Sequence, residues 1–479
     1  MLLPFPLKRK RKTMTTAQET RPNTLRWWAL GLIALAQFMV IMDTSIIGVA
    51  LPRMRDALGF TPSTLSWVFN AYVIAFGGLL LLGGRLSDLF GARRLFAAGW
   101  AILLAGSVLA GAAGNVPVEL AGRVVQGAGA ALIAPSALTL LMMLFGSNPK
   151  ELTKALALYG AAAPAGGTAG VFLGGVLTEY LSWPWVFYLN VPIALLALFA
   201  TRAVLPGGAA GTRGAVDVLG ALTVTLGLGT LVYGIVRAPE AGWAAAETWI
   251  ALGAGFVLLA GFVVRQAKAR TPLMRLSIFR APRLGAANLA QVFLGAAWIP
   301  MWFFLNLYLQ QVLGFRAFPA GAALLPMTAL IMLGMIALAP RVIGRFGPKP
   351  PIVAGLLLLA AGLGWLALVR ADGSFWVDVL PASLVAALGM SLAFIPSLST
   401  AISAARPEEG GLASGIVNTG YQVGSALGLA VMTALAAASG AGALGDPAAL
   451  TSGYSVAFVG SAAIALVGAG LAALTFRRR

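Results

Sequence analysis

The sequence contains no cysteine and no histidine. The absence of cysteine excludes disulfides and thiol chemistry, and the absence of histidine excludes histidine metal ligands and histidine proton relays. Carboxylates therefore remain the only side chains able to exchange protons near neutral pH. The chain also has no G-x-x-x-x-G-K-[ST] loop, which argues against ATP as a direct energy source.

Charged residues are scarce as well. They make up 10% of the 479 residues, whereas 59% are hydrophobic, and the mean hydropathy is +0.89. Soluble domains contain about 25% charged and about 45 to 50% apolar residues. The composition therefore predicts an integral membrane protein, all-α and polytopic, because apolar runs of about 20 residues cross the bilayer as helices.

Fourteen apolar runs are long enough to span a membrane, near 27–52, 63–84, 95–114, 118–143, 155–178, 184–205, 217–236, 248–266, 285–309, 319–340, 351–369, 378–402, 411–439 and 453–475. An even number places both chain ends on one side. Most of the Lys and Arg residues fall on that side, including clusters at Lys8–Lys12 and Arg477–Arg479. The positive-inside rule then predicts a multi-pass protein of the cell membrane with both termini in the cytoplasm.

Asp43 lies deep within the first apolar run. An ionised carboxylate there costs about 2.5 to 3.5 kcal/mol even on lenient insertion scales. We take Asp43 to be the single acid inside the membrane, which makes it the candidate proton-binding group.

Arg123 is predicted at a similar depth. It lies about 9 Å below the outer end of its helix and Asp43 about 12 Å below the same level, at about 1.5 Å per residue. We expect the two charges to interact directly or through water, with Gln126 one turn further along the same face. The alternative is a structural pair that only fixes helix packing.

A short motif occurs twice. Residues Gly83–Arg94 follow the second run, residues Pro340–Lys349 follow the tenth, and the copies share Arg, Phe, Gly and basic positions at one constant offset. The repeat indicates two related halves. The predicted organisation is a basic cytoplasmic N-terminus at 1–26, a six-helix bundle at 27–205, two extra helices with a cytoplasmic linker at 206–284, and a second six-helix bundle at 285–479.

The first copy of the motif is a candidate cytoplasmic gating loop, formed by Gly84, Arg85, Asp88, Gly91, Arg93 and Arg94. Glycine suits the tight turn, and the charged residues can pair with each other and with helix ends. The alternative is an ordinary basic turn that obeys the positive-inside rule.

With these motifs the chain resembles the major facilitator superfamily, most closely its fourteen-span drug:proton antiporter branch. The resemblance is carried by Gly84–Arg94, by Asp43–Pro52 with Gly48 in place of a usual Asn, by Arg123–Gly129, and by Trp183–Pro192 with Pro184 in place of a usual Arg. It implies a fold of two six-helix bundles with two extra central helices, in which helices one and four line a central cavity.

Helix five departs from the antiporter pattern. Gly166, Gly170 and Gly174 form a stripe on which a neighbouring helix can pack closely. The motif that this stripe resembles expects Pro after the middle glycine, where this chain has Val171. Ordinary glycine packing and an antiport-specific hinge both remain open.

In the second half, Asn418 and Gln422 share one face of helix thirteen and are candidates for substrate contact or for interhelical packing.

The function predicted is a proton-coupled exporter of lipophilic or cationic drugs. The alternative is a facilitator of a metabolite, lipid or amino acid, which Val171 and Gly48 favour. We expect a monomer whose partners are a small substrate, protons and the lipid bilayer, with no enzymatic activity, cofactor, metal or nucleic acid.

Overall fold

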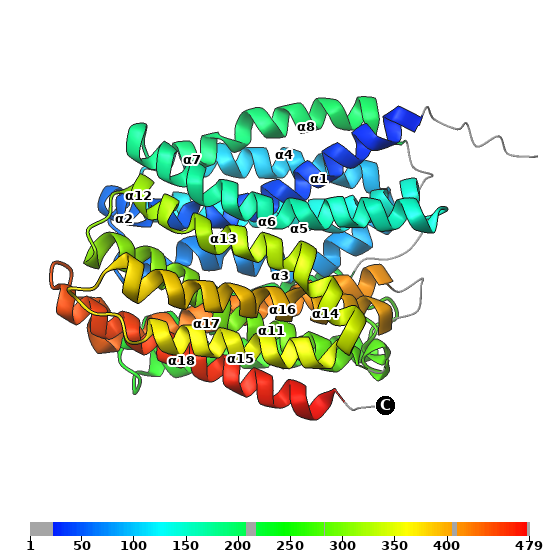
Figure 1. The fold of residues 1–479 in the computed structure, drawn as a ribbon. Helices are drawn as coiled ribbons and strands as arrows, with labels where there is room; N and C mark the ends of the chain where they lie inside the picture. Colours follow the sequence, from blue (N-terminus) through cyan, green and yellow to red (C-terminus); the bar gives the residue numbers. More distant parts are fainter. Residues whose placement is uncertain (1–22, 207–216, 282, 405–409, 477–479) are drawn as a thin grey trace, which may run out of the picture.

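The computed structural model describes residues 23–206, 217–281, 283–404 and 410–476. Over these residues the secondary structure is helical and contains no strand. The long helices run side by side in one bundle (Figure 1). Fourteen helices in the described ranges are long and apolar enough to cross a membrane, as the sequence predicts.

The first bundle comprises α1 to α8. Their bounds are α1 (Asn23–Ser45), α2 (Ile47–Leu58), α3 (Trp67–Phe90), α4 (Ala92–Gly111), α5 (Val116–Phe145), α6 (Pro149–Tyr180), α7 (Trp185–Tyr188) and α8 (Asn190–Val204). The predicted first span ends at Pro52, but helical structure continues through Pro52 to Leu58, where Gly59 stops it with a φ of 78°.

The extra pair is α9 (Val218–Ala241) and α10 (Ala246–Lys268). The second bundle follows as α11 (Leu284–Leu307), η3 (Tyr308–Val312), α12 (Ala317–Ala323), α13 (Leu325–Leu333), η4 (Gly334–Leu338), α14 (Ala339–Phe346), α15 (Lys349–Leu366), η5 (Phe375–Val379), α16 (Leu380–Ala404), α17 (Gly410–Ala436), η7 (Ala437–Ala441) and α18 (Pro447–Thr475). The tenth span, predicted as one run, is divided into four consecutive helical pieces.

The start of α1 and the end of α18 lie at the same end of the bundle (Figure 1). We call this end the terminal face and the opposite end, where α2 and α12 lie, the distal face.

The repeated motif has the same backbone form in both bundles. Gly91 between α3 and α4 has a φ of 90°, and Gly347 between α14 and α15 has a φ of 75°, which only glycine adopts at low cost. Eight residues further on, Gly99 of α4 and Gly355 of α15 each lie against the backbone of the following α-helix, α5 and α16 respectively. Much of each motif is helical, because α3 extends to Phe90 and α14 begins at Ala339.

The two bundles meet closely at the distal face. A Cβ on Gly175 of α6 would lie 2.9 Å from the Ala317 carbonyl oxygen, and a Cβ on Gly321 of α12 would lie 2.6 Å from the Val171 carbonyl oxygen. Arg316 forms an ion pair of 3.1 Å with Glu179, which also accepts a 2.7 Å hydrogen bond from the Phe318 N–H. The terminal-face end of the same span, α14, instead packs against α15, α16 and η4 within its own bundle.

Asp217 anchors the extra pair at the terminal face. It caps α9 by accepting from the Gly220 N–H, and it accepts hydrogen bonds of 2.5 Å from Arg265 and 2.9 Å from Gln266 on α10. Burial acts to raise the pKa of Asp217, but these hydrogen bonds and the Arg265 charge outweigh it and hold the pKa below its usual value. The charged form of Asp217 therefore stabilises the fold.

We expect Asp217→Asn to lower the free energy of unfolding by about 1 to 2 kcal/mol at neutral pH. Because the folded-state pKa is lowered, the stabilisation is present above the unfolded-state pKa of about 3.9 and is lost as the pH falls through the folded-state value. Thermal unfolding in detergent at neutral and acid pH measures the difference, with exposed Asp372→Asn as control. Equal stability of Asp217→Asn and wild type at neutral pH would contradict this account.

Candidate functional site

Asp43 lies at the centre of a buried polar cluster within the first bundle. Its carboxylate is 0% exposed and accepts hydrogen bonds from Arg123 Nη1 at 2.8 Å, Gln126 Nε2 at 3.2 Å and Asn190 Nδ2 at 2.7 Å. The donors come from α5 and from the first residue of α8. Three donors, one of them a guanidinium, thus surround the carboxylate.

Arg123 is held by hydrogen bonds from Nε and Nη1 and by two aromatic rings. Its side chain is 0% exposed, Nε donates to the Val68 carbonyl at 2.9 Å, and Nη1 also donates to Gln126 Oε1 at 2.7 Å. The ring of Tyr72 lies with its centroid 4.5 Å from the guanidinium carbon, and the ring of Phe187 at 5.8 Å. Cation–π contacts and hydrogen bonds together stabilise the buried cation.

Glycines bring α4 and α5 close enough to complete the cluster. A Cβ on Gly106 or on Gly122 would lie 2.6 Å from a backbone nitrogen of the facing helix, so neither position accepts a side chain. The close approach places Ser107 Oγ 2.8 Å from Gln126 Nε2 and 3.3 Å from Asn190 Nδ2. Ser107 thus links the donors around Asp43.

The cluster contains the predicted residues Asp43, Arg123 and Gln126, which the structure places in direct contact. Asn190 and Ser107 also belong to it and were not predicted, although Asn190 lies in one of the motifs that carry the resemblance. Among the residues that the structure describes, no three acidic side chains lie close enough to hold a metal ion.

Glu119 is a second buried acid, and it lies near the start of the candidate membrane span Val116–Phe145. Glu119 lies in the first turn of α5, four residues before Arg123, and is 0% exposed. Neither carboxylate oxygen has a hydrogen-bond partner among the described residues. Its position inside the apolar run 118–143 could have indicated a buried acid. Only the packing of the neighbouring helices shows that the side chain is shielded from water.

The candidate gating residues lie at the terminal face. Gly84 and Arg85 are on α3, Gly91 joins α3 to α4, and Arg93 and Arg94 are in the first turn of α4. Arg93 donates a 3.1 Å hydrogen bond to the Arg202 carbonyl in the last turn of α8, a helix end that favours positive charge. The side chain of Asp88 lies outside the described residues.

The glycine stripe of α6 packs against the backbone of α1. A Cβ would lie 2.2 Å from the Phe38 carbonyl oxygen at Gly166, 2.8 Å from the Met42 carbonyl oxygen at Gly170, and 2.5 Å from the Ile46 carbonyl oxygen at Gly174. No side chain fits at such distances. Because α1 carries Asp43, the stripe fixes the position of the acid relative to α6.

Gln422 and Asn418 lie on α17, apart from the Asp43 cluster. A Cβ on Gly77 of α3 would lie 2.7 Å from the Gln422 Cβ, so Gln422 is part of the contact between the two bundles. On the same helix, Gly424 and Gly428 approach backbone carbonyls of α11.

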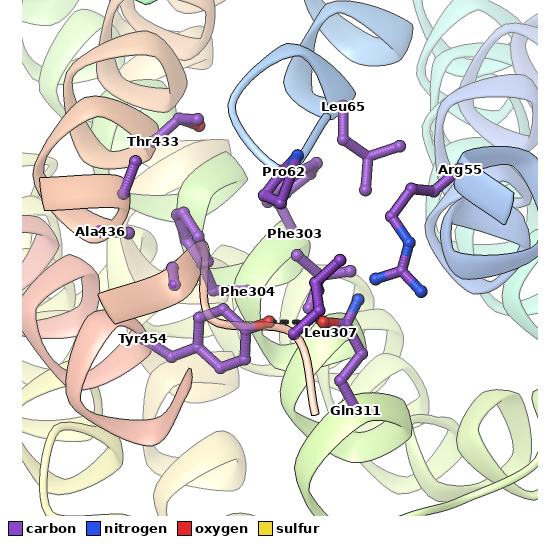
Figure 2. A pocket seen from close by; sticks show the side chains of 13 residues that line it. Arg55, Pro62, Leu65, Phe303, Phe304, Leu307, Gln311, Thr433, Ala436 and Tyr454 are labelled. Atoms are coloured by element: carbon purple, nitrogen blue, oxygen red, sulfur yellow. Dashed lines mark hydrogen bonds between the residues drawn. The ribbon is translucent and has the colours of Figure 1, made fainter. Parts of the chain in front are cut away.

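A small cavity lies between the bundles at the distal face (Figure 2). Arg55 and Leu65 of the first bundle form one side, and Phe303, Phe304, Gln311 and Tyr454 of the second bundle form the other. Tyr454 Oη donates a 2.9 Å hydrogen bond to Gln311 Oε1, the dashed line in Figure 2. The lining is thus mostly apolar, with aromatic side chains from the second bundle and one cation, Arg55, from the first.

The profile of the Major Facilitator Superfamily matches residues 33–429. The chain belongs to this superfamily. It is 39% identical over 95% of its length to the cephamycin export protein CmcT of Amycolatopsis lactamdurans, of which the match covers 93%. It is 35% identical over 94% of its length to the puromycin resistance protein pur8 of Streptomyces alboniger, of which the match covers 91%.

Solved facilitator structures share the fold. The nucleoside transporter NupG superposes with a TM-score of 0.66 at 13% identity, covering 95% of this facilitator and 100% of that chain. A bacterial homologue of the lysosomal transporter Spinster superposes with a TM-score of 0.67 at 16% identity, covering 95% and 98%. The predicted fold is confirmed, and membership of the superfamily makes the protein a transporter rather than an enzyme.

Proposed function

We propose that this facilitator exports small lipophilic or cationic antibiotics in exchange for protons. The observation that carries the proposal is the ion pair of Asp43 and Arg123, sealed inside the first bundle. A carboxylate buried in this way can gain or lose a proton when the protein changes conformation. Relatives named for cephamycin export, puromycin resistance and multidrug resistance support the substrate class.

The orientation follows from charge. Basic residues gather at the terminal face, so this face lies in the cytoplasm and the distal face outside. The tight contact of α6 with α12 then closes the outer side. In this orientation the conformation is closed to the outside, and Asp43 is paired with Arg123.

Proton movement is coupled to transport through a change in the ion pair of Asp43 and Arg123. Opening of the distal side admits a proton to Asp43, and the neutral acid no longer balances Arg123, so the cluster rearranges. Closure and opening to the cytoplasm restore the pair and release the proton. At ~100 mV one charge supplies about 2.3 kcal/mol, roughly a fifty-fold concentration ratio for a neutral substrate exchanged one for one.

A facilitator of a metabolite, lipid or amino acid is the second candidate. It is favoured by Val171, which stands where the antiporter motif has proline. At this position α6 continues as a helix, and the Val171 carbonyl lies against Gly321 of α12.

Two measurements separate these functions. Purified protein in weakly buffered detergent solution should release protons when an antibiotic substrate binds, and a metabolite facilitator should not. A screen of dyes and antibiotics in cells that lack other efflux pumps should identify the substrate. Uptake or efflux of metabolites alone, with no proton release by any drug, would contradict the proposal.

The distal ion pair gives a further prediction. Glu179→Gln removes the negative charge that pairs with Arg316. Because the pair is partly exposed, it contributes about 1 kcal/mol, so the population of the state open at the distal face is expected to rise about five-fold. The chain has no native cysteine, so Ala320→Cys, buried in α12, reports opening through its rate of labelling by a membrane-impermeant reagent.

The matched control for this experiment is Glu247→Gln in the same Ala320→Cys background. Glu247 lies at the distal end of α10 with a half-exposed side chain and is remote in sequence from the seam of α6 and α12. An unchanged labelling rate in Glu179→Gln would show that the ion pair does not hold the distal side closed.

A further inference from the structure

Glu119 is an acidic residue in a buried position that offers its carboxylate no hydrogen-bond donor among the described residues. Its carboxylate is fully buried, and neither oxygen accepts a hydrogen bond from any described residue. Leaving an ionised carboxylate without a donor in such surroundings costs several kcal/mol, so the neutral acid is the favoured form in this conformation. The protein thus holds one ionised acid at Asp43 and one neutral acid at Glu119.

Arg123, one helical turn from Glu119, has a guanidinium nitrogen that makes no hydrogen bond to any described residue. Its Nη1 serves both Asp43 and Gln126, but its Nη2 is buried and has no partner among the described residues. Glu119 is four residues before Arg123 on α5, one helical turn toward the distal face. An acid followed by a base at this spacing is the favoured arrangement of an intrahelical ion pair. A contact between Nη2 and Glu119 would give each of the two groups the partner that it lacks.

The other charges around Glu119 are few. Arg123 on its own helix and Asp43 on α1 are the charged groups that interact with it electrostatically, and the Tyr72 ring on α3 packs against the guanidinium. The distal half of α4, packed against α5, carries no charged residue between Gly99 and Gly111. Glu119 also lies in the first turn of α5, where the helix dipole favours a negative charge. Both protonation states are therefore accessible once water or Arg123 approaches.

We propose that Glu119 is the proton-loading site on the distal side and the alternative partner of Arg123. The inference rests on the proposed proton coupling and deepens it. In one arrangement Arg123 pairs with ionised Asp43 and Glu119 is neutral, as in this structure. In the other, Arg123 pairs with ionised Glu119 and Asp43 is neutral. One proton and one guanidinium are shared by two carboxylates, and the three groups together stay uncharged.

The proton step is balanced. A proton from outside water binds ionised Glu119 and releases Arg123, which moves to Asp43 and displaces its proton toward the cytoplasmic side. To reset, the O–H bond of Glu119 breaks, water carries the proton to the Asp43 carboxylate, and Arg123 returns to Glu119. One proton enters from outside and one leaves to the inside in each cycle. In both steps Arg123 ends beside the ionised carboxylate, so no buried charge is left unpaired.

Infrared spectroscopy of the purified protein tests the protonation state directly. At neutral pH the wild type should show the C=O stretch of a protonated carboxylic acid, and Glu119→Gln should lack it. Asp43→Asn should weaken the band, because Glu119 is then the acid left to pair with Arg123. Glu247→Gln, a matched change at an exposed distal glutamate, should keep the band. A spectrum of wild type without this band, or a band that persists in Glu119→Gln, overturns the proposal.

Transport by reconstituted vesicles tests the relay. Glu119→Gln should lower efflux driven by a pH gradient at least about ten-fold, the low end of what a positioned proton-transfer group contributes. Substrate exchange without a gradient should stay close to the wild-type rate, and Glu119→Asp should recover part of the driven efflux. The exchange rate also shows that each variant is folded.

The outcomes separate this inference from the proposed function. If wild-type vesicles show no transport driven by a pH gradient, the proposed antiport is wrong and the relay falls with it. If wild type is driven by the gradient and Glu119→Gln is driven equally well, antiport stands and the role of Glu119 is wrong. If Glu119→Gln loses exchange as well as driven efflux and Glu119→Asp recovers neither, Glu119 is structural and the relay is wrong.

Discussion

Asp43→Asn is expected to abolish drug efflux driven by a pH gradient, by about a hundred-fold or more. The amide cannot take up or release a proton, so the cluster of Arg123, Gln126 and Asn190 has no charge that changes with conformation. Efflux from reconstituted vesicles with an acid exterior measures the effect. Proton release on substrate binding should disappear in the same variant.

The control for this variant is Asp56→Asn, which removes an exposed carboxylate at the end of α2. Wild-type coupling is expected there, because Asp56 is solvated and pairs only with its neighbour Arg55. Substrate exchange in the absence of a gradient should remain measurable in Asp43→Asn. Gradient-driven efflux that survives the loss of the carboxylate would show that the proton binds elsewhere.

Arg123→Gln is expected to destabilise the protein by about 3 to 5 kcal/mol, because it leaves the Asp43 carboxylate buried without a cation. The loss should appear as a large fall in the thermal unfolding temperature in detergent. Gradient-driven efflux should be lost as well, since the carboxylate would then hold its proton in both conformations.

The double variant Asp43→Asn with Arg123→Gln separates stability from coupling. Two amides keep the hydrogen-bonding capacity of the site without a buried charge, so much of the stability should return while coupling stays absent. Stability losses that simply add in the double variant would mean that the two side chains do not interact as the 2.8 Å contact indicates.

The fold was predictable because each span carries its own signal. An apolar run long enough to cross the bilayer is visible without knowledge of its neighbours, and the count of fourteen follows from such runs alone. Interruptions inside a span carry no comparable signal. The tenth span reads as one run but is divided at Leu324 and by the π-helical turn from Gly334 to Leu338, since those residues are as apolar as the rest.

The site was predictable in part, and the limit is physical. Depth along a helix can be counted, which is why Asp43 and Arg123 could be placed at one level. Asn190 lies 147 residues from Asp43 in sequence, and only tertiary packing brings its amide to 2.7 Å. Glu119 shows the same limit, because an acid in the first turn of a helix is solvated or buried according to the elements that cover it.

The cavity of Figure 2 has walls from both bundles, with Arg55 on one and Tyr454 on the other. Any rocking of one bundle against the other must therefore change its shape. A compound that filled it would act as a wedge, holding the seam at one spacing and arresting the cycle. Such an arrest would not depend on which antibiotic is carried, so resistance to one substrate and to another would be reversed together.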